Sequence, residues 1–324
     1  MEKYIVNTPE AALTKGERIE KGIWRPGIMD RFTDKLGVGS TTKLTEVRAP
    51  GARHLPQLRI TSDPSRVIED RDELEASLKA KNTGESVDDF RGRKVAAGMQ
   101  LTRMLRNLDL EANPRDMLKT RLTHGTNIVL VDKEYLALPK AEQAMMAADG
   151  LITRMKHIPI MVAAADCAPI IIYDPKTETV GVFHAGYRGT VAGIARKGIE
   201  TMAREYQCKP EDLIVSVGPY ADGDSYEIDT GLLEQFRNQK NDDGEPAYTE
   251  DDLKKMFKPH PTDVAKVMYD NGEAIRLQAE KAGVNRENIE VSQLSTMKDN
   301  ELLSSDRKEG FNNRDTLMAM AVLK

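Results

Sequence analysis

Apolar residues recur at the spacing of amphipathic helices in several parts of the chain. Residues 65–82, "SRVIEDRDELEASLKAKN", show this spacing behind a serine, which predicts a capped helix, and residues 93–108 show it again. The stretch 139–154 predicts a short helix that is ended by Asp149-Gly150, and the same spacing predicts further helices over 189–207, 229–239 and 261–283, the last of them closed by Gly283.

Short apolar runs bounded by turn residues predict strands between these helices. Such runs occupy 124–132, 212–219 and 288–294, and residues 315–323 fit a strand or a short helix. The stretch "IPIMVAAADCAPIIIYDPKTETVGVFHAGYRG" (158–189) contains three runs in succession, and "DPKTE" is the kind of turn that joins antiparallel neighbours. Because strands and helices are mixed and hairpins are indicated, the pattern favours an α+β fold over a doubly wound parallel sheet.

The composition of the chain and its domain organisation limit the kinds of protein that it can be. Residues 1–30 are polar and lack periodicity, which predicts an irregular N-terminal arm, and we expect residues 31–324 to form a single domain since no repeat or linker divides them. A net charge of −5 gives no support for a nucleic-acid-binding face. The start of the chain lacks the pattern of a signal peptide and no run is long enough to span a membrane, so we expect a cytoplasmic protein.

Three side chains with metal-binding chemistry stand at the ends of predicted strands: His124, Cys167 and His184. Taken singly, each is typical of a structural histidine or a packed thiol. Two imidazoles and one thiolate that converge would leave one position open on a tetrahedral Zn²⁺, as catalytic sites do. Asp166, next to the thiol, is a candidate proton carrier or orienting group.

The segment after His184 adds candidate anion-binding groups. "HAGYRGT" (184–190) combines a strand end, a glycine turn and a helix start, where exposed backbone N–H groups favour negative charge. Arg188 contributes a planar guanidinium that suits phosphate or carboxylate.

Several other metal and hydrolase sites are excluded by the absence of their motifs. The chain contains no H-E-x-x-H, no H-x-E with P-C-x-x-C, no G-x-S-x-G and no P-loop. Copper stays open as an alternative, because two histidines and a cysteine are also the ligands of a blue-copper centre. A multicopper laccase, however, needs more imidazoles than the five histidines present.

Four blocks of the chain, in order, resemble the signature blocks of the laccase-domain family, also called the multicopper polyphenol oxidase or purine nucleoside phosphorylase family. They are "THGT", "ADCAPIIIYD", "VFHAGYRGTVAGIARKGIETM" and "VSVGPYADGDSYEI". The similarity runs from about residue 30 to the end of the sequence. "VIEDRDEL" resembles the early helix of the family, with Asp70-Arg71 in place of Asn-Arg.

The resemblance implies a single-domain fold of layered mixed β-sheets flanked by helices, and a metal held by His124, Cys167 and His184. It implies zinc-dependent phosphorolysis of adenosine, inosine, guanosine and methylthioadenosine, with adenosine deaminase activity as well, so the expected partners are a purine nucleoside and phosphate. Copper-dependent polyphenol oxidation, or a role such as cell-wall precursor editing, are the alternatives that the family offers.

The resemblance also supplies candidate site residues. We expect Asp166 and Arg188 to act in catalysis, and Gly186 and Gly189 to let backbone amides approach a substrate oxygen or phosphate. The other candidate substrate contacts are Tyr187, Lys35, Arg71, Arg307 and Arg314. The chain departs from the family at Tyr187 (usually Trp), at Ser295 (usually Cys) and in "LSSDR" (303–307, usually aromatic-rich), changes that bear on substrate preference more than on the metal.

Overall fold

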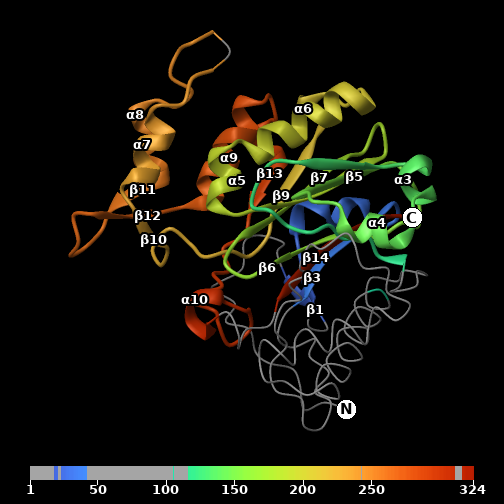
Figure 1. The fold of residues 1–324 in the computed structure, drawn as a ribbon, viewed down its shortest axis with the longest axis horizontal. Coiled ribbons are helices and arrows are strands. Elements are labelled where there is room, and N and C mark those ends of the chain that lie inside the picture. The colour runs from blue at the N-terminus through green and yellow to red at the C-terminus, as the bar shows by residue number, and fades with distance from the viewer. Residues whose placement is uncertain (1–17, 21–22, 42–104, 106–115, 242, 311–315) are drawn as a thin grey trace, which may run out of the picture.

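The computed structural model describes residues 18–20, 23–41, 105, 116–241, 243–310 and 316–324 (Figure 1). The helices predicted over 65–82 and, apart from Leu105, over 93–108 lie outside the described residues, as do Arg71 and Arg314.

A six-stranded mixed sheet forms the middle layer of the molecule. Its strands, in order of neighbours, are β13 (Ile289–Val291), β9 (Ile214–Val217), β7 (Ala168–Asp174), β8 (Thr179–Ala185), β5 (Gly150–Thr153) and β4 (Ile128–Val131). β7 is antiparallel to both β8 and β9, whereas β4 and β5 run parallel, as do β9 and β13. The mixed pairing confirms the predicted α+β class.

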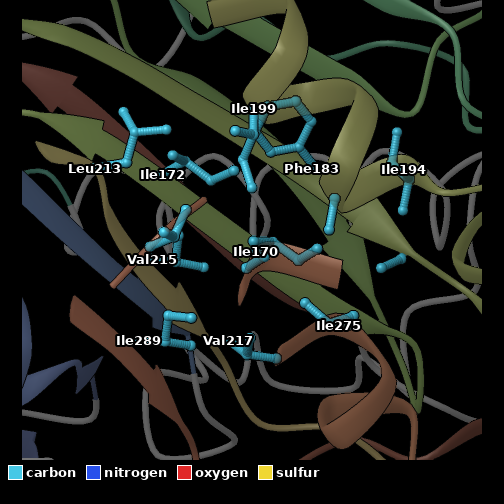
Figure 2. Close-up of a cluster of buried hydrophobic side chains, with 14 of the residues drawn as sticks. Ile170, Ile172, Phe183, Ile194, Ile199, Leu213, Val215, Val217, Ile275 and Ile289 are labelled. Atoms are coloured by element: carbon cyan, nitrogen blue, oxygen red, sulfur yellow. The ribbon is translucent and has the colours of Figure 1, made fainter. Parts of the chain in front are cut away.

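Alternating residues of β7 face two different cores, which explains why every residue of this strand is buried. Ile170 and Ile172 pack with Phe183 and with the helices above the sheet, in the cluster drawn in Figure 2. Ile171 and Tyr173 point the other way and pack against a second sheet. The six-stranded sheet is therefore covered on both faces.

The second sheet has five strands and lies against the lower face of the first (Figure 1). Its order is β1 (Arg18–Glu20), β2 (Ile23–Arg25), β3 (Leu36–Thr41), β14 (Leu317–Leu323) and β6 (Ile160–Ala164). β14 is central and pairs antiparallel with both β3 and β6, so residues 317–323 form a strand and not a helix. The prediction of an irregular arm over residues 1–30 is wrong for β1 and β2, because β1 pairs with β2 and β2 pairs with β3.

Helices cover the opposite face of the six-stranded sheet: α5 (Tyr187–Val191), α6 (Ile194–Tyr206) and α9 (Asn271–Lys281) (Figure 1). The sequence pattern predicts one helix over 189–207. The chain instead breaks between α5 and α6 at Gly193, whose φ of 81° is a left-handed conformation that glycine adopts without steric cost.

A small three-stranded sheet projects to one side of the body together with α7 (Gly231–Arg237) and α8 (Glu250–Met256) (Figure 1). In its centre β12 (Lys266–Tyr269) pairs with β10 (Glu227–Asp229) and β11 (Phe257–Pro259). The helix predicted over 261–283 is therefore wrong in its first part. α9 starts only after Asp270, whose carboxylate accepts a hydrogen bond from the N–H of Glu273 and caps the helix.

Short helices complete the described chain: the 3₁₀ turns η2 (Gly27–Phe32), η5 (Pro210–Asp212) and η6 (Arg286–Asn288), with α3 (Lys133–Ala137), α4 (Lys140–Met145) and α10 (Asp306–Glu309). The short helix predicted to end at Asp149-Gly150 ends earlier, at Met145, and Gly150 is the first residue of β5. No helix among the described residues is long and apolar enough to cross a bilayer.

Candidate metal centre

His124, Cys167 and His184 meet at one edge of the six-stranded sheet. His124 lies in the loop before β4, Cys167 directly precedes β7, and His184 is the last residue but one of β8. The antiparallel register of β7 and β8 pairs Pro169 with His184, which places the thiol beside the imidazole.

The three donor atoms lie within 4.8 Å of one another, and the two imidazole rings meet edge to face at 4.8 Å. A tetrahedral zinc ion, with bonds of about 2.0–2.3 Å, holds its donors about 3.3–3.8 Å apart. No pair of donor atoms therefore needs to close by more than about 1.5 Å to share an ion of this kind. The donor set and its spacing fit a zinc ion with an open position.

Asp149 links two of the three side chains and was missed in the sequence, where Asp149-Gly150 reads as a helix end. Its fully buried carboxylate contacts Nδ1 of His184 at 3.0 Å and accepts the backbone N–H of His124 at 2.8 Å. A polar residue directly before a buried apolar run is the signal that could have found it.

Charge interactions in the site favour a thiolate beside a protonated imidazole when no ion is bound. Burial raises the pKa of the Cys167 thiol, but the charge of His184 and a hydrogen bond with His124 outweigh burial and lower this pKa to about 6. Burial lowers the pKa of His184, yet the Cys167 thiolate and Asp149 raise it to about 9. By contrast, burial raises the pKa of Cys208, the other cysteine, to about 11.

Asp166 is held in place by the chain around it. One carboxylate oxygen accepts a hydrogen bond from Oγ1 of Thr296 at 2.6 Å, and the other accepts the backbone N–H of Arg307 at 2.8 Å. The residue itself adopts a left-handed φ of 76°. Asp166 thus anchors the segment that carries Thr296 and Arg307 next to Cys167, and its role as a proton carrier stays a prediction.

Gly186 and Gly189 give room to neighbouring groups of the protein, and their predicted role toward a substrate stays a prediction. A Cβ on Gly186 would lie 2.9 Å from Cδ2 of His124 and 3.0 Å from Sγ of Cys167. A Cβ on Gly189 would lie 2.8 Å from the carbonyl oxygen of Gly125. Both glycines therefore let α5 pack against the loop of His124.

The helix start lies at a different residue from the one predicted for the anion site. α5 begins at Tyr187, two residues before Gly189, and the N–H of Thr190 donates to the carbonyl oxygen of Gly186 at 2.9 Å inside the helix. Arg188 is exposed, and its guanidinium lies over the ring of Tyr187 at 5.1 Å. The side chain of Arg188, and not the amide of Thr190, is the group available to an anion.

A second guanidinium lies over an aromatic ring on the Asp166 side of the site. The Arg307 guanidinium is 4.5 Å from the ring centroid of Tyr226. Burial, and then the charge of Cys167, raise the pKa of the Tyr226 phenol to about 12, which places this ring near the thiolate. The structure therefore keeps Arg307 near the candidate metal site, and Tyr226 joins it as a neighbour.

Lys35 lies at the opposite end of the sheet, contrary to its predicted role as a substrate contact. Its ammonium pairs with Glu178 at 3.1 Å, in the turn between β7 and β8. His184 follows Thr179, the first residue of β8, by five residues, which at about 3.3 Å per residue is about 17 Å. Lys35 is therefore too remote to touch a substrate at the three ligands of the same chain.

The model of the family described as "Multi-copper polyphenol oxidoreductase laccase" matches residues 69–323. The chain belongs to this family. Among its curated relatives, the purine nucleoside phosphorylase of Bacteroides thetaiotaomicron is 29% identical over 65% of this chain and 75% of its own length. The "Adenosine deaminase RL5" of an unknown prokaryotic organism is 35% identical over 38% of this chain and 47% of its own length. Relatives of this laccase family are thus named as enzymes that act on purine nucleosides.

Solved structures of similar proteins share the fold. YlmD from Geobacillus stearothermophilus has a TM-score of 0.71 at 22% identity and covers 97% of this chain and 99% of its own. The hypothetical protein YfiH of Bacillus licheniformis has a TM-score of 0.70 at 21% identity, covering 96% and 100%. These similarities confirm the layered mixed-sheet architecture.

Proposed function

We propose that this protein is a zinc-dependent purine nucleoside phosphorylase. The observation that carries the proposal is the convergence of His124, Cys167 and His184, from the loop before β4, the start of β7 and the end of β8, on donor positions that fit one ion with an open site. The relatives named purine nucleoside phosphorylase support the substrate class. Adenosine, inosine, guanosine and methylthioadenosine are the proposed nucleosides.

Phosphorolysis forms a bond between a phosphate oxygen and C1′ of the ribose and breaks the bond from C1′ to the purine, which leaves with a proton. A bound zinc ion supplies a Lewis acid that orients oxygen ligands and stabilises negative charge. The exposed guanidinium of Arg188 is the proposed phosphate-binding group, and Arg307, held on Tyr226, is the proposed second positive charge. Asp166, which fixes the backbone of Arg307, keeps that charge in position.

Deamination of adenosine at the same site is the second candidate, favoured by the 35% identity to the relative named adenosine deaminase. The candidate metal ligands of the described residues disfavour multicopper oxidation. Among the described residues, three or more His, Cys, Asp or Glu donors gather only at His124, Cys167 and His184, and several copper ions need several such groups.

Metal-free protein reloaded with Zn²⁺ or Cu²⁺ tests the proposal. With zinc and phosphate, we expect inosine to give hypoxanthine and ribose 1-phosphate. Release of ammonia from adenosine in the absence of phosphate would show that deamination also occurs. Turnover that appears with copper and a phenol, and not with zinc and nucleosides, would overturn the assignment.

A labelling experiment provides a prediction about the two free cysteines. In metal-free protein at pH 7, iodoacetamide should modify Cys167 because its thiol is ionised at this pH, and should spare Cys208, which is buried and only 4% exposed. Saturating zinc should protect Cys167. Mass spectrometry of tryptic peptides measures both, and modification of Cys167 at the same rate with and without zinc would contradict its role as a ligand.

A further inference from the structure

Asp149 receives an unusual concentration of hydrogen bonds for one side chain. Five donors reach its carboxylate: Nδ1 of His184, Oγ1 of Thr123, and the consecutive backbone N–H groups of residues 123, 124 and 125, at distances from 2.5 to 3.2 Å. The side chain is completely buried. A carboxylate in such a place is stable because it is surrounded by donors.

The three consecutive amides form a concave backbone pocket around the carboxylate, and this geometry determines how His124 is presented. His124 has a φ of 58°, a left-handed conformation that a non-glycine residue keeps only where its surroundings hold it. The N–H of His124 and that of Gly125 point to the two different oxygens of Asp149. The carboxylate thus supplies the contacts that hold this backbone turn.

The same carboxylate selects the ring nitrogen that His184 presents to the site. Because Nδ1 of His184 faces Asp149, a proton on Nδ1 leaves Nε2 as the lone-pair donor toward Cys167 and His124. The register of β5 and β8 keeps Asp149 and His184 opposite each other. Gly150 pairs with Phe183 in the antiparallel β5–β8 ladder, and the N–H of His184 donates to the carbonyl oxygen of Asp149 at 2.7 Å.

We propose that Asp149 is the positioning residue of the metal site: one buried carboxylate sets both the backbone conformation of His124 and the tautomer of His184. The two imidazoles, although 60 residues apart in the sequence, are aligned by a single group. This inference rests on the metal site of the proposed function and not on its substrate.

The test is Zn²⁺ affinity measured by competition with a chromophoric chelator. Asp149→Asn preserves the size of the side chain but replaces one acceptor oxygen by an NH₂ group, which faces backbone donors. We expect zinc affinity to fall about 10–100-fold, the usual cost of losing such a partner. An unchanged affinity in a folded Asp149→Asn protein would refute the proposal.

Asp174→Asn is the matched control. Asp174 is also buried, in the same sheet, and its carboxylate accepts hydrogen bonds from the N–H groups of Lys176 and Thr177 and from the hydroxyl of Thr177. It lies at the far end of β7 from Cys167. We expect it to lower the melting temperature as Asp149→Asn does, with zinc affinity unchanged; equal losses of affinity in both variants would mean that Asp149 acts only through stability.

A measurement on the unmodified protein avoids any folding defect. In ¹⁵N-histidine-labelled protein loaded with zinc, we expect His184 to carry its proton on Nδ1, as seen in long-range ¹H–¹⁵N spectra. A proton on Nε2 would overturn the proposal even if Asp149→Asn does not fold. Failure of the unmodified protein to bind zinc would remove the metal site and this inference together, whereas zinc binding without nucleoside turnover would remove only the proposed reaction.

Discussion

Cys167→Ser is expected to lower zinc affinity by more than about 100-fold and to abolish phosphorolysis at micromolar zinc, because the change removes the only thiolate of the three donors. Serine is close to cysteine in size, so the surrounding loop should keep its shape. Elemental analysis of purified protein, with an assay for hypoxanthine release from inosine, measures both effects. His184→Ala should have the same effect on metal and turnover.

Cys208→Ser is the control for this change. Its thiol is buried and lies 3.2 Å from Oγ1 of Thr177, near the opposite end of the sheet. This variant should retain zinc and turnover, with only a loss of thermal stability. Full zinc content in Cys167→Ser would show that the thiol is not a ligand.

Gly186→Ala is expected to have the second large effect. The new methyl group would lie 2.9 Å from the His124 ring, closer than real Cβ atoms come to another group, and 3.0 Å from Sγ of Cys167, closer than most of them come. Overpacking of this kind costs about 1–3 kcal/mol, and here relief requires two ligands to move apart. We expect zinc affinity to fall about 100-fold, measured by the same chelator competition, and turnover to fall with it.

Gly231→Ala separates this steric effect from the general cost of replacing a glycine. Gly231 begins α7, and a Cβ there would meet only Oδ1 of Asp229, an exposed side chain that can turn away. Zinc affinity and turnover should be unchanged. If Gly186→Ala retained full affinity, the close packing of this turn against the ligands would not matter for the metal.

The candidate ligands could be predicted from the sequence because each precedes, follows or ends a recognisable apolar run, and because the order of the blocks around them resembles one family. The three strands over 158–189 were predicted for the same reason: the apolar runs are separated by clear turns. A buried strand with a polar residue at its end can therefore be recognised from its own stretch of sequence.

Asp149 and Lys35 show what local patterns leave out. Asp149 follows a helix in the sequence and looks like part of a turn, yet its partners at His184 and at residues 123–125 come from strand pairing. Lys35 resembles a substrate contact by its place in a motif, but its position at the other end of β8 follows from how the two sheets stack. Only the assembled sheets determine these contacts.

The boundary of α9 illustrates a different difficulty. Residues 261–283 have apolar spacing that suits a helix throughout, and the alternating burial of "KVMY" (266–269) suits a strand equally well. The choice between helix and strand for residues 266–269 depends on β10 and β11, which offer hydrogen bonds on both sides of this segment. Tertiary pairing outweighs helix propensity here.

The position of β14 has a consequence for biosynthesis. This strand fills the gap between β3 and β6, although ribosomes translate it about 280 residues after β3 and about 150 after β6. Until that segment emerges, both neighbours expose unpaired edges, which are templates for association between nascent chains. Chaperone capture of partly translated protein should therefore persist until residues 317–323 have emerged from the ribosome, and end abruptly once they are available.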